Sequence, residues 1–385
     1  ASGALATRET YNGRFSSRQW SRRLENVFPH WDYLSVNWRD SFENPVSIVD
    51  PADEPPTRVI SVPKTAKGPR IIAMEPVWNQ YIQQGILHAI VDVLKRPSHL
   101  RLFEGFDWTY QDFNQLLARI GSEKGNLATI DLSEASDRVT NQLVDEGLLS
   151  CNLLLREAVK ASRSTRAQIP SGEIITLKKF ASMGSSLTFP LESMVFYTII
   201  HLAYVEHHGR YPSAPLGPVD GVRVYGDDLI IPVSLVPGVC RLLELYQLKI
   251  NESKSFWTGK FRESCGSDWY AGYPVKPVRL RAPLPTSPHQ HDLIIKGIKF
   301  HNQLIEHGFL ELAESVEQAL QAVRWIPYTF VGEDHDALWT SKEDLIQVRM
   351  NPRLHRTEVK TLVRRQRKPK DPLDSWGALS KFFPP

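Results

Sequence analysis

Two adjacent aspartates, Asp227 and Asp228, lie in a segment whose residue types favour metal binding. They follow Tyr225-Gly226, and mainly apolar runs flank these four residues at 222–224 and 229–231. Apolar runs around a glycine-containing turn predict a β-hairpin. Two carboxylates on a rigid turn repel each other, and a divalent cation such as Mg²⁺, which prefers oxygen ligands, removes that cost. The alternative is an acidic hairpin turn that binds no metal.

A third carboxylate, Asp131, ends the apolar run 126–131, which reads as a short strand. If the hairpin pairs beside this strand, three carboxylates converge at one edge of a small antiparallel sheet. Three carboxylates suit two magnesium ions, and two such ions suit phosphoryl transfer. Taken alone, an aspartate at a strand end is more often a turn former than a ligand.

The elements around these residues predict a mixed α+β protein. Proline-rich stretches at 45–76 and 274–288 predict loop connections, because proline breaks helices. The segment from Asp292 onward predicts a mainly helical C-terminal region. Three further helices are expected at 133–149, from Gly184 to a stop at Gly209, and at 235–248.

Composition excludes several classes of protein. The formal net charge is +3, and no uninterrupted apolar run is long enough to cross a membrane. Three scattered cysteines are too few for a disulfide framework or a zinc site, so a reducing interior such as cytoplasm fits best. The chain begins at Ala1 without a Met, so part of the natural N-terminal region is expected to be missing. A basic tract at 364–370 reads either as a contact for an anionic partner or as a solvated tail.

Six segments resemble, in order, motifs of viral RNA-dependent RNA polymerases. Residues 261–266 (Phe-Arg-Glu-Ser-Cys-Gly) closely resemble a segment characteristic of replicases from single-stranded RNA bacteriophages. Six ordered motifs over roughly residues 58–280 are far more specific than any one of them. The other five are 62–70 (a basic fingertip motif), 129–137 (first catalytic motif), 182–189 (second), 225–228 (third) and 248–255 (fourth).

The chain is therefore similar to the catalytic beta subunit of levivirus-like replicases. The resemblance implies a right-hand polymerase fold of fingers, palm and thumb, with a small antiparallel palm sheet flanked by helices. Residues 1–125 would form the N-terminal region and fingers, and 117–260 the catalytic core with a fingers insertion near 151–180. Residues 261–385 would form the end of the palm and a helical thumb.

The resemblance also implies a role for each motif residue. Asp131, Asp227 and Asp228 would be metal ligands for two Mg²⁺ ions, with Mn²⁺ as an alternative ion. Lys64, Lys67 and Arg70 would hold the triphosphate; otherwise they form a solvated basic loop. Lys254 would donate a proton to departing pyrophosphate, although a surface lysine is the usual reading.

Four residues are expected at the ribose of the nucleotide. Asp137 would contact the sugar, or else is a first-turn aspartate favoured by the helix dipole. Ser185, Ser186 and Thr188 would hydrogen-bond the ribose or simply cap a helix. Many relatives have Asn-Gly where this chain has Ser185-Ser186, and a Ser hydroxyl can substitute because it both donates and accepts.

The implied activity is RNA-dependent RNA synthesis that replicates a positive-strand phage genome in the cytoplasm of a bacterial host. The implied partners are RNA template and product, ribonucleoside triphosphates, host elongation factors Tu and Ts and, in some relatives, a small-subunit ribosomal protein, with no membrane. Two rivals remain: a reverse transcriptase, which shares an aspartate-rich palm hairpin, and a non-catalytic RNA-binding protein that kept a polymerase scaffold.

Overall fold

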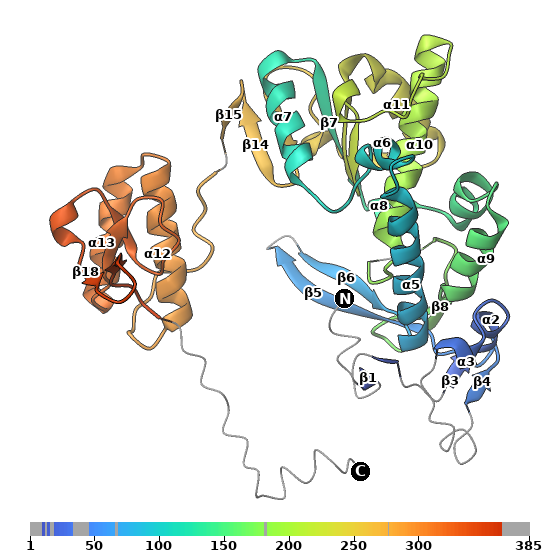
Figure 1. Ribbon diagram of the computed structural model, residues 1–385, viewed down its shortest axis with the longest axis horizontal. Coiled ribbons are helices and arrows are strands. Elements are labelled where there is room, and N and C mark those ends of the chain that lie inside the picture. The colour runs from blue at the N-terminus through green and yellow to red at the C-terminus, as the bar shows by residue number, and fades with distance from the viewer. Residues whose placement is uncertain are drawn as a thin grey trace, which may run out of the picture. The chain divides into compact units, whose positions relative to one another are not determined.

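The computed structural model describes residues 10–11, 14–15, 19–33, 46–65, 68–180, 183–275 and 277–363. The chain divides into two compact units, Ala1–Lys276 and Pro277–Pro385, and each is described by itself (Figure 1). The basic tract at 364–370 lies outside the described residues. In the described part of the chain, no helix combines the length and the apolar composition that crossing a membrane requires.

The centre of the first unit is an antiparallel sheet with the strand order β10–β11–β7–β12. It confirms the predicted strand ending near Asp131 and the predicted Gly-Asp-Asp hairpin. Its strands are β7 (Leu127–Ser133), β10 (Arg223–Tyr225), β11 (Asp228–Pro232) and β12 (Lys249–Ile250).

Helices cover both faces of this sheet because its strands are apolar on both sides. Ala128, Ile130 and Leu132 on β7 join the main core, which contains buried residues of α10 (Thr188–His208) and α11 (Val236–Leu245). Leu127 and Ile230 face the other way and pack with α7 (Asp112–Lys124), which lies beside β7 in Figure 1. The predicted helix that stops at Gly209 is confirmed, since Gly209 caps α10 in the left-handed conformation.

The remaining elements of the first unit form its N-terminal part, an insertion before α10, and a small sheet after β12. The N-terminal part has β1 (Thr10–Tyr11), β2 (Arg14–Phe15), β3 (Gln19–Ser21), α2 (Arg22–Glu25), α3 (His30–Tyr33), β4 (Ser47–Val49), β5 (Thr57–Thr65), β6 (Gly68–Met74), α5 (Val77–Leu94) and α6 (Leu100–Glu104). The others are α8 (Ala135–Arg138), a π-helix (Leu143–Leu148), α9 (Leu153–Ser162), β8 (Arg166–Gln168), β9 (Ile174–Thr176), β13 (Phe261–Ser264), β14 (Ser267–Tyr270) and β15 (Tyr273–Pro274), with 3-10 turns at Pro218–Asp220, Val233–Leu235 and Glu252–Lys254.

Two expectations about local structure were wrong. The predicted helix at 133–149 breaks after α8, because Val139 is extended and its carbonyl accepts a hydrogen bond from the N–H of Phe180 (2.8 Å). The proline-rich stretch at 45–76 contains the long hairpin β5–β6 rather than only loops. Pro63 is tolerated there because the pairing register shifts between Val62 and Thr65, where a missing N–H costs no ladder bond.

The second unit has its own core between α12 (His291–Glu306) and α13 (Leu310–Val323). These helices confirm the predicted helical character of the region after Asp292. Short strands follow them and were not anticipated. They are β16 (Tyr328–Phe330), β17 (Leu338–Thr340), β18 (Val348–Asn351) and β19 (Arg356–Val359), with a 3-10 turn at Glu343–Leu345.

Arg223 fixes the strand that leads into the aspartate hairpin. Its side chain is 1% exposed and donates to the carbonyls of Glu104, Asp107 (2.8 Å) and Tyr110 (3.1 Å). It also donates to the side chain of Asn114 (3.3 Å) on α7. A buried guanidinium with this many acceptors ties the α6–α7 connection to β10.

We therefore expect Arg223→Met to lower the free energy of unfolding by about 3 kcal/mol, because it leaves buried acceptors unpaired. Arg241→Met is the matched control, since Arg241 pairs with Glu206 at the exposed surface and should cost less than about 1 kcal/mol. Urea unfolding of the two variants tests this, and equal losses would contradict the assigned role of Arg223.

Candidate active site

The backbone register brings two of the three predicted aspartates together. Asp131 on β7 is the direct cross-strand partner of Asp228 on β11. Side chains that oppose each other on an antiparallel pair lie on one face, with Cβ atoms roughly 5 Å apart. Asp227 precedes Asp228 in the hairpin turn, so the backbone places all three aspartates at one end of the sheet.

The hairpin turn is held against α10. Tyr225 pairs with Asp228, which leaves Gly226 and Asp227 as a two-residue loop. Gly226 has φ of +59°, and a Cβ there would lie 2.3 Å from the Phe189 ring. The N–H of Gly226 donates to the Ser193 hydroxyl (3.1 Å). Glycine is therefore required both for the backbone conformation and for the close approach to α10.

The loop that follows β12 surrounds Asp131. The Asn251 side-chain amide donates to the Asp131 carboxylate (2.6 Å), and the Asn251 N–H donates to the Asp131 carbonyl (2.9 Å). The Ser255 hydroxyl accepts the Asp131 N–H (3.1 Å). These contacts fix the orientation of Asp131, and sequence reasoning did not find either partner, although both lie in the fourth motif.

A second tight turn contacts Asp228. Cys265 and Gly266 form the loop between β13 and β14, and both have positive φ, as a type I′ turn requires. The Cys265 N–H donates to the Asp228 carboxylate (3.3 Å). Burial, followed by the charges of Asp227 and Asp131, raises the pKa of Asp228 from 3.8 to about 6. The segment 261–266 thus supports the site through a backbone contact that its sequence did not reveal.

Glu192 on α10 is a further carboxyl that sequence reasoning missed. Its side chain is 6% exposed, and its Oε2 has no hydrogen-bond partner among the described residues. Burial, and then the charges of Asp227 and Asp137, raise its pKa well above the ordinary value. Glu192 therefore lies close enough to Asp227 and to Asp137 on α8 for their charges to affect it. Its position four residues after Thr188, one helical turn into α10, was the available signal.

The donor set at this end of the sheet fits hard divalent cations. The oxygens are carboxylates, which such ions prefer as ligands. Burial, followed by the charges of Asp227 and Asp131, raises the pKa of Asp228. The described side chains are not arranged as a complete metal-binding site. Within the described residues, no group of three His, Cys, Asp or Glu side chains is placed to hold a metal ion. Cation binding at this site is therefore a proposal.

Comparison with known proteins shows the family. Residues 52–300 match the family model described as RNA replicase, beta-chain. The chain belongs to this family. It is 36% identical over 231 residues to the RNA-directed RNA polymerase subunit beta of Qbeta virus (strain MX1), covering 59% of this chain and 36% of that protein. It is also 36% identical over 226 residues to the RNA-directed RNA polymerase beta chain of Escherichia phage MS2, covering 59% of this chain and 38% of that one.

These matches confirm the resemblance that the six motifs indicated. The chain spans less than half the length of the curated relatives that it matches. Among solved structures, it is similar to an insertion-loop deletion mutant of the RNA-dependent RNA polymerase of a human picorbirnavirus. That match has a TM-score of 0.45 and 15% identity, and covers 70% of this chain and 57% of the other.

The second motif of this replicase-family chain is held by its neighbours. The Ser186 hydroxyl accepts from Gln80 and Gln84 of α5 (2.6 Å each), and the Ser185 hydroxyl accepts the Leu187 N–H (3.3 Å). Thr188 is the first residue of α10 and is buried. Gly184 has φ of +134°, and a Cβ there would lie 1.9 Å from the Ala73 carbonyl oxygen of β6. These contacts place the loop on β6 and α5.

The basic residues are less fully placed. Arg70 is exposed on β6, and the backbone of Lys64 lies in β5. Lys67 and the side chain of Lys64 lie outside the described residues. Lys254 is exposed and ends a 3-10 turn, and its N–H donates to the carbonyl of Asn251 (3.0 Å). The side chain of Asn251 also donates to Asp131. Asp137 lies on α8, and partial burial followed by the charge of Glu134 raises its pKa.

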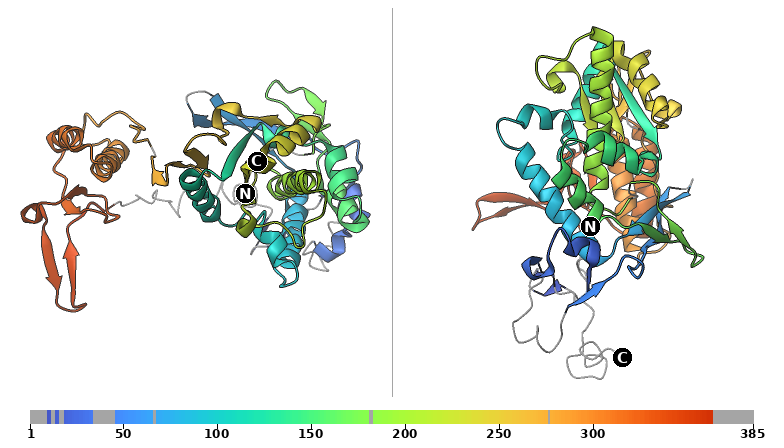
Figure 2. Two further views of the ribbon diagram at one scale, coloured as in Figure 1. Left: turned by 90° about the horizontal axis from the view of Figure 1, so that it is seen from above. Right: turned by 90° about the vertical axis from the view of Figure 1, so that its right-hand side faces the viewer.

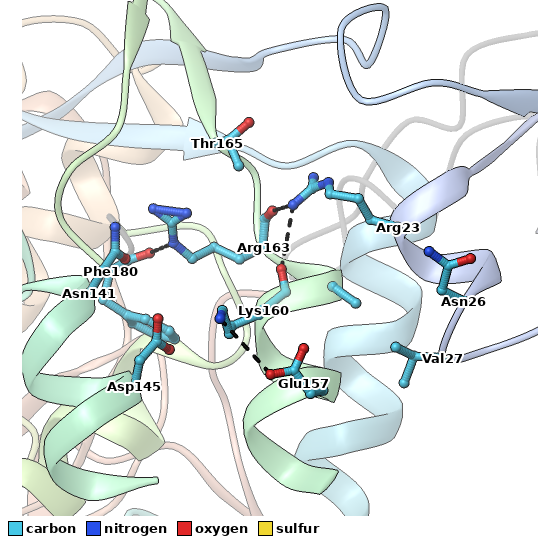
Figure 3. Close-up of a pocket in the computed structure, with 11 residues that line it drawn as sticks. Arg23, Asn26, Val27, Asn141, Asp145, Glu157, Lys160, Arg163, Thr165 and Phe180 are labelled. Carbon is cyan, nitrogen blue, oxygen red and sulfur yellow. Dashed lines mark hydrogen bonds and ion pairs between the residues drawn. The ribbon is translucent and has the colours of Figure 1, made fainter. Parts of the chain in front are cut away.

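A cavity of about 460 Å³ lies elsewhere in the first unit, between α2 and α9 (Figure 3). None of the predicted site residues lines it. Its arginines have structural partners. Arg23 binds Glu54 and donates to the Arg163 carbonyl (2.8 Å), while Arg163 donates to the Phe180 carbonyl (2.7 Å). The cavity therefore lies between α2 and the insertion, and both of these arginines already have hydrogen-bond acceptors.

We expect Asp228→Asn to stabilise the metal-free protein above pH 6. A carboxyl whose pKa rises to about 6 on folding binds protons more tightly in the native state, so its contribution to stability falls as pH rises from about 4 through 6. The full cost is at most about 3 kcal/mol. Thermal unfolding should show a higher Tm for the variant at pH 8 and little difference at pH 4.

The same experiment has a metal arm. Mg²⁺ should raise the Tm of the parent and not that of Asp228→Asn, since a ligand stabilises only the state that binds it. Asp53→Asn, at an exposed position in a turn, is the control and should behave like the parent. Equal Mg²⁺ responses in parent and Asp228→Asn would remove Asp228 from the ligand set.

Glu192→Gln tests whether this carboxyl is neutral in the folded protein. Because its pKa is raised, the parent should lose stability as pH rises from about 4.5 toward the folded pKa, and the glutamine variant should not. The difference in free energy of unfolding between the two proteins should therefore grow with pH in favour of the variant. A difference that is constant across pH would mean that Glu192 stays ionised.

Proposed function

We propose that this chain carries out RNA-directed RNA synthesis with ribonucleoside triphosphates, as part of the replication of a positive-strand phage genome. The observation that carries the proposal is the pairing of Asp131 with Asp228 beside Asp227, in a chain of the replicase beta-chain family. The curated relatives are named as RNA-directed RNA polymerases of RNA phages. On this proposal the sheet is the palm, residues 1–125 supply the fingers, and 261–385 include the thumb.

The proposed chemistry is attack of a 3′-hydroxyl on the α-phosphate of a nucleoside triphosphate, with pyrophosphate as the leaving group. Asp131, Asp227 and Asp228 would hold two Mg²⁺ ions, or Mn²⁺ in their place. When bound, such ions lower the cost of charge on the attacking and leaving oxygens. Asn251 and the Cys265 N–H would orient two of the three carboxylates, because they already donate to them.

The other residues would act on the substrate. Lys64, Lys67 and Arg70 would hold the triphosphate, as point charges and as a bidentate fork. Lys254 would supply a proton to pyrophosphate. Ribose contacts would come from Ser185, Ser186, Thr188 and Asp137, and Glu192 fits among them because a neutral carboxyl can both donate and accept.

The proposed setting is the cytoplasm of a bacterial host. RNA template, RNA product and nucleotides are the direct partners. Host elongation factors Tu and Ts, and a small-subunit ribosomal protein, enter only through the resemblance to phage replicases.

We expect Asp227→Asn to abolish nucleotide incorporation while RNA binding stays close to that of the parent, since phosphate contacts elsewhere supply most of the affinity. Primer extension on an RNA template, with and without Mg²⁺ and bacterial extract, measures the first quantity and a filter-binding assay the second. Asp53→Asn is the control for a charge removed from the surface. Equal incorporation by parent and Asp227→Asn would reject the metal assignment.

The same assay separates the rivals. A polymerase of this family should extend with ribonucleotides, whereas a reverse transcriptase would prefer deoxynucleotides on the same template. A parent protein that binds RNA but incorporates neither nucleotide, even with extract present, would favour the non-catalytic RNA-binding protein.

A further inference from the structure

The positive charge of the second unit is concentrated in one segment. Residues 346–370 contain nine Lys and Arg against a single Glu. The rest of residues 277–385 contains seven Lys and Arg against twelve Asp and Glu. The described part of this basic segment is the antiparallel hairpin β18–β19.

The hairpin is anchored at its base and exposed along its length. Ile346, just before β18, is 5% exposed, and Leu362, just after β19, packs against the core of the unit. The Lys360 N–H donates to the Gln347 carbonyl (3.1 Å) and closes the base. Beyond this point the two strands pair with each other alone among the described residues, and the ribbon stands out from α12 and α13 (Figure 2).

The register places the cations on one face of the ribbon. Arg349 pairs with Glu358 and Asn351 with Arg356, so these side chains share a face, and Lys360 follows Glu358 at the same alternation. Arg353 lies in the turn. Glu358 contacts Arg356 (3.8 Å), and this is the sole acidic group of the hairpin.

The tip of the hairpin is fixed by its own sequence. The Asn351 side chain accepts the N–H groups of Arg353 (3.0 Å) and Leu354 (3.1 Å), and its amide donates to Glu358 (2.7 Å). Lys360 lies 4.6 Å from the centre of the Trp325 ring, which is half exposed. The cations are therefore carried on a shaped element, and the contact with Trp325 leaves the charge of Lys360 in place.

We propose that the hairpin β18–β19 is an RNA-binding ribbon that contacts the phosphate backbone through Arg349, Arg353, Arg356 and Lys360. The inference rests on the proposed function, because that function identifies RNA as the polyanion. Charge complementarity favours RNA, because the cations follow one another along a projecting ribbon while the rest of the unit is acidic and would repel a polyanion. Cations beside an exposed aromatic ring also suit a single strand.

The test uses the full chain with Arg349→Gln, Arg353→Gln and Lys360→Gln combined. The control combines Lys296→Gln, Lys299→Gln and Lys342→Gln, which removes the same charge from exposed positions of the same unit. The probe is a labelled single-stranded RNA of mixed sequence, titrated at several salt concentrations without nucleotides or Mg²⁺. The hairpin variant should bind about tenfold more weakly at low salt, and its salt slope should fall by about 2.

The control variant should keep the Kd and the salt slope of the parent. Retention of both by the hairpin variant would overturn the proposal and leave an acidic protein surface as the occupant of the ribbon. Equal weakening in the two variants would also overturn it, because net charge alone would then explain the effect. The result is independent of polymerisation: an inactive parent whose RNA affinity depends on the hairpin would reject the proposed function and keep the ribbon.

Discussion

The burial of neighbouring carboxylates at the end of a small sheet is the constraint on which the candidate site depends. Asp131 and Asp228 are opposed by strand register, so they cannot separate without breaking the pairing of β7 and β11. Donors that reach them include neutral groups, the Asn251 amide and the Cys265 N–H. Neutral donors orient a carboxylate but do not cancel its charge. Burial, followed by the charges of Asp227 and Asp131, raises the pKa of Asp228. The ionised arrangement therefore costs stability, and the proposed cations would remove that cost.

The hairpin turn that carries Asp227 also packs against α10. Gly226 lies against Phe189, its N–H is held by Ser193, and Glu192 lies between them in sequence. The same helix begins at Thr188, directly after the loop that β6 and α5 hold in place. The loop expected at the ribose and the turn that carries Asp227 therefore both contact the same helix.

Sequence reasoning found the elements whose signals are local. The strand before Asp131, the hairpin around Gly226 and the helix ending at Gly209 each depend on a short pattern and a turn residue, and all three are present. The prediction of a helix at 133–149 was wrong because the carbonyl of Val139 accepts a hydrogen bond from the N–H of Phe180, which is distant in sequence. Asn251 and the Cys265 N–H were missed for the same reason, since they reach the aspartates through contacts across 120 and 37 residues of chain. Glu192 was missed because it becomes part of the site through burial. No periodicity within a short window reports such contacts.

The candidate site of the first unit is rich in carboxylates, whereas residues 346–370 of the second unit are rich in Lys and Arg. Carboxylates repel a polyanion, so under the proposed function the binding energy for a long RNA would come from other residues. Net charge of +3 over the whole chain would not suggest a strong cationic surface, yet the segment 346–370 alone holds nine Lys and Arg. Under the two proposals, this separation of charge would let RNA affinity and chemistry be supplied by different residues. It also explains why the overall charge of a protein is a poor guide to whether it binds nucleic acid, whereas the local distribution along a projecting element is informative.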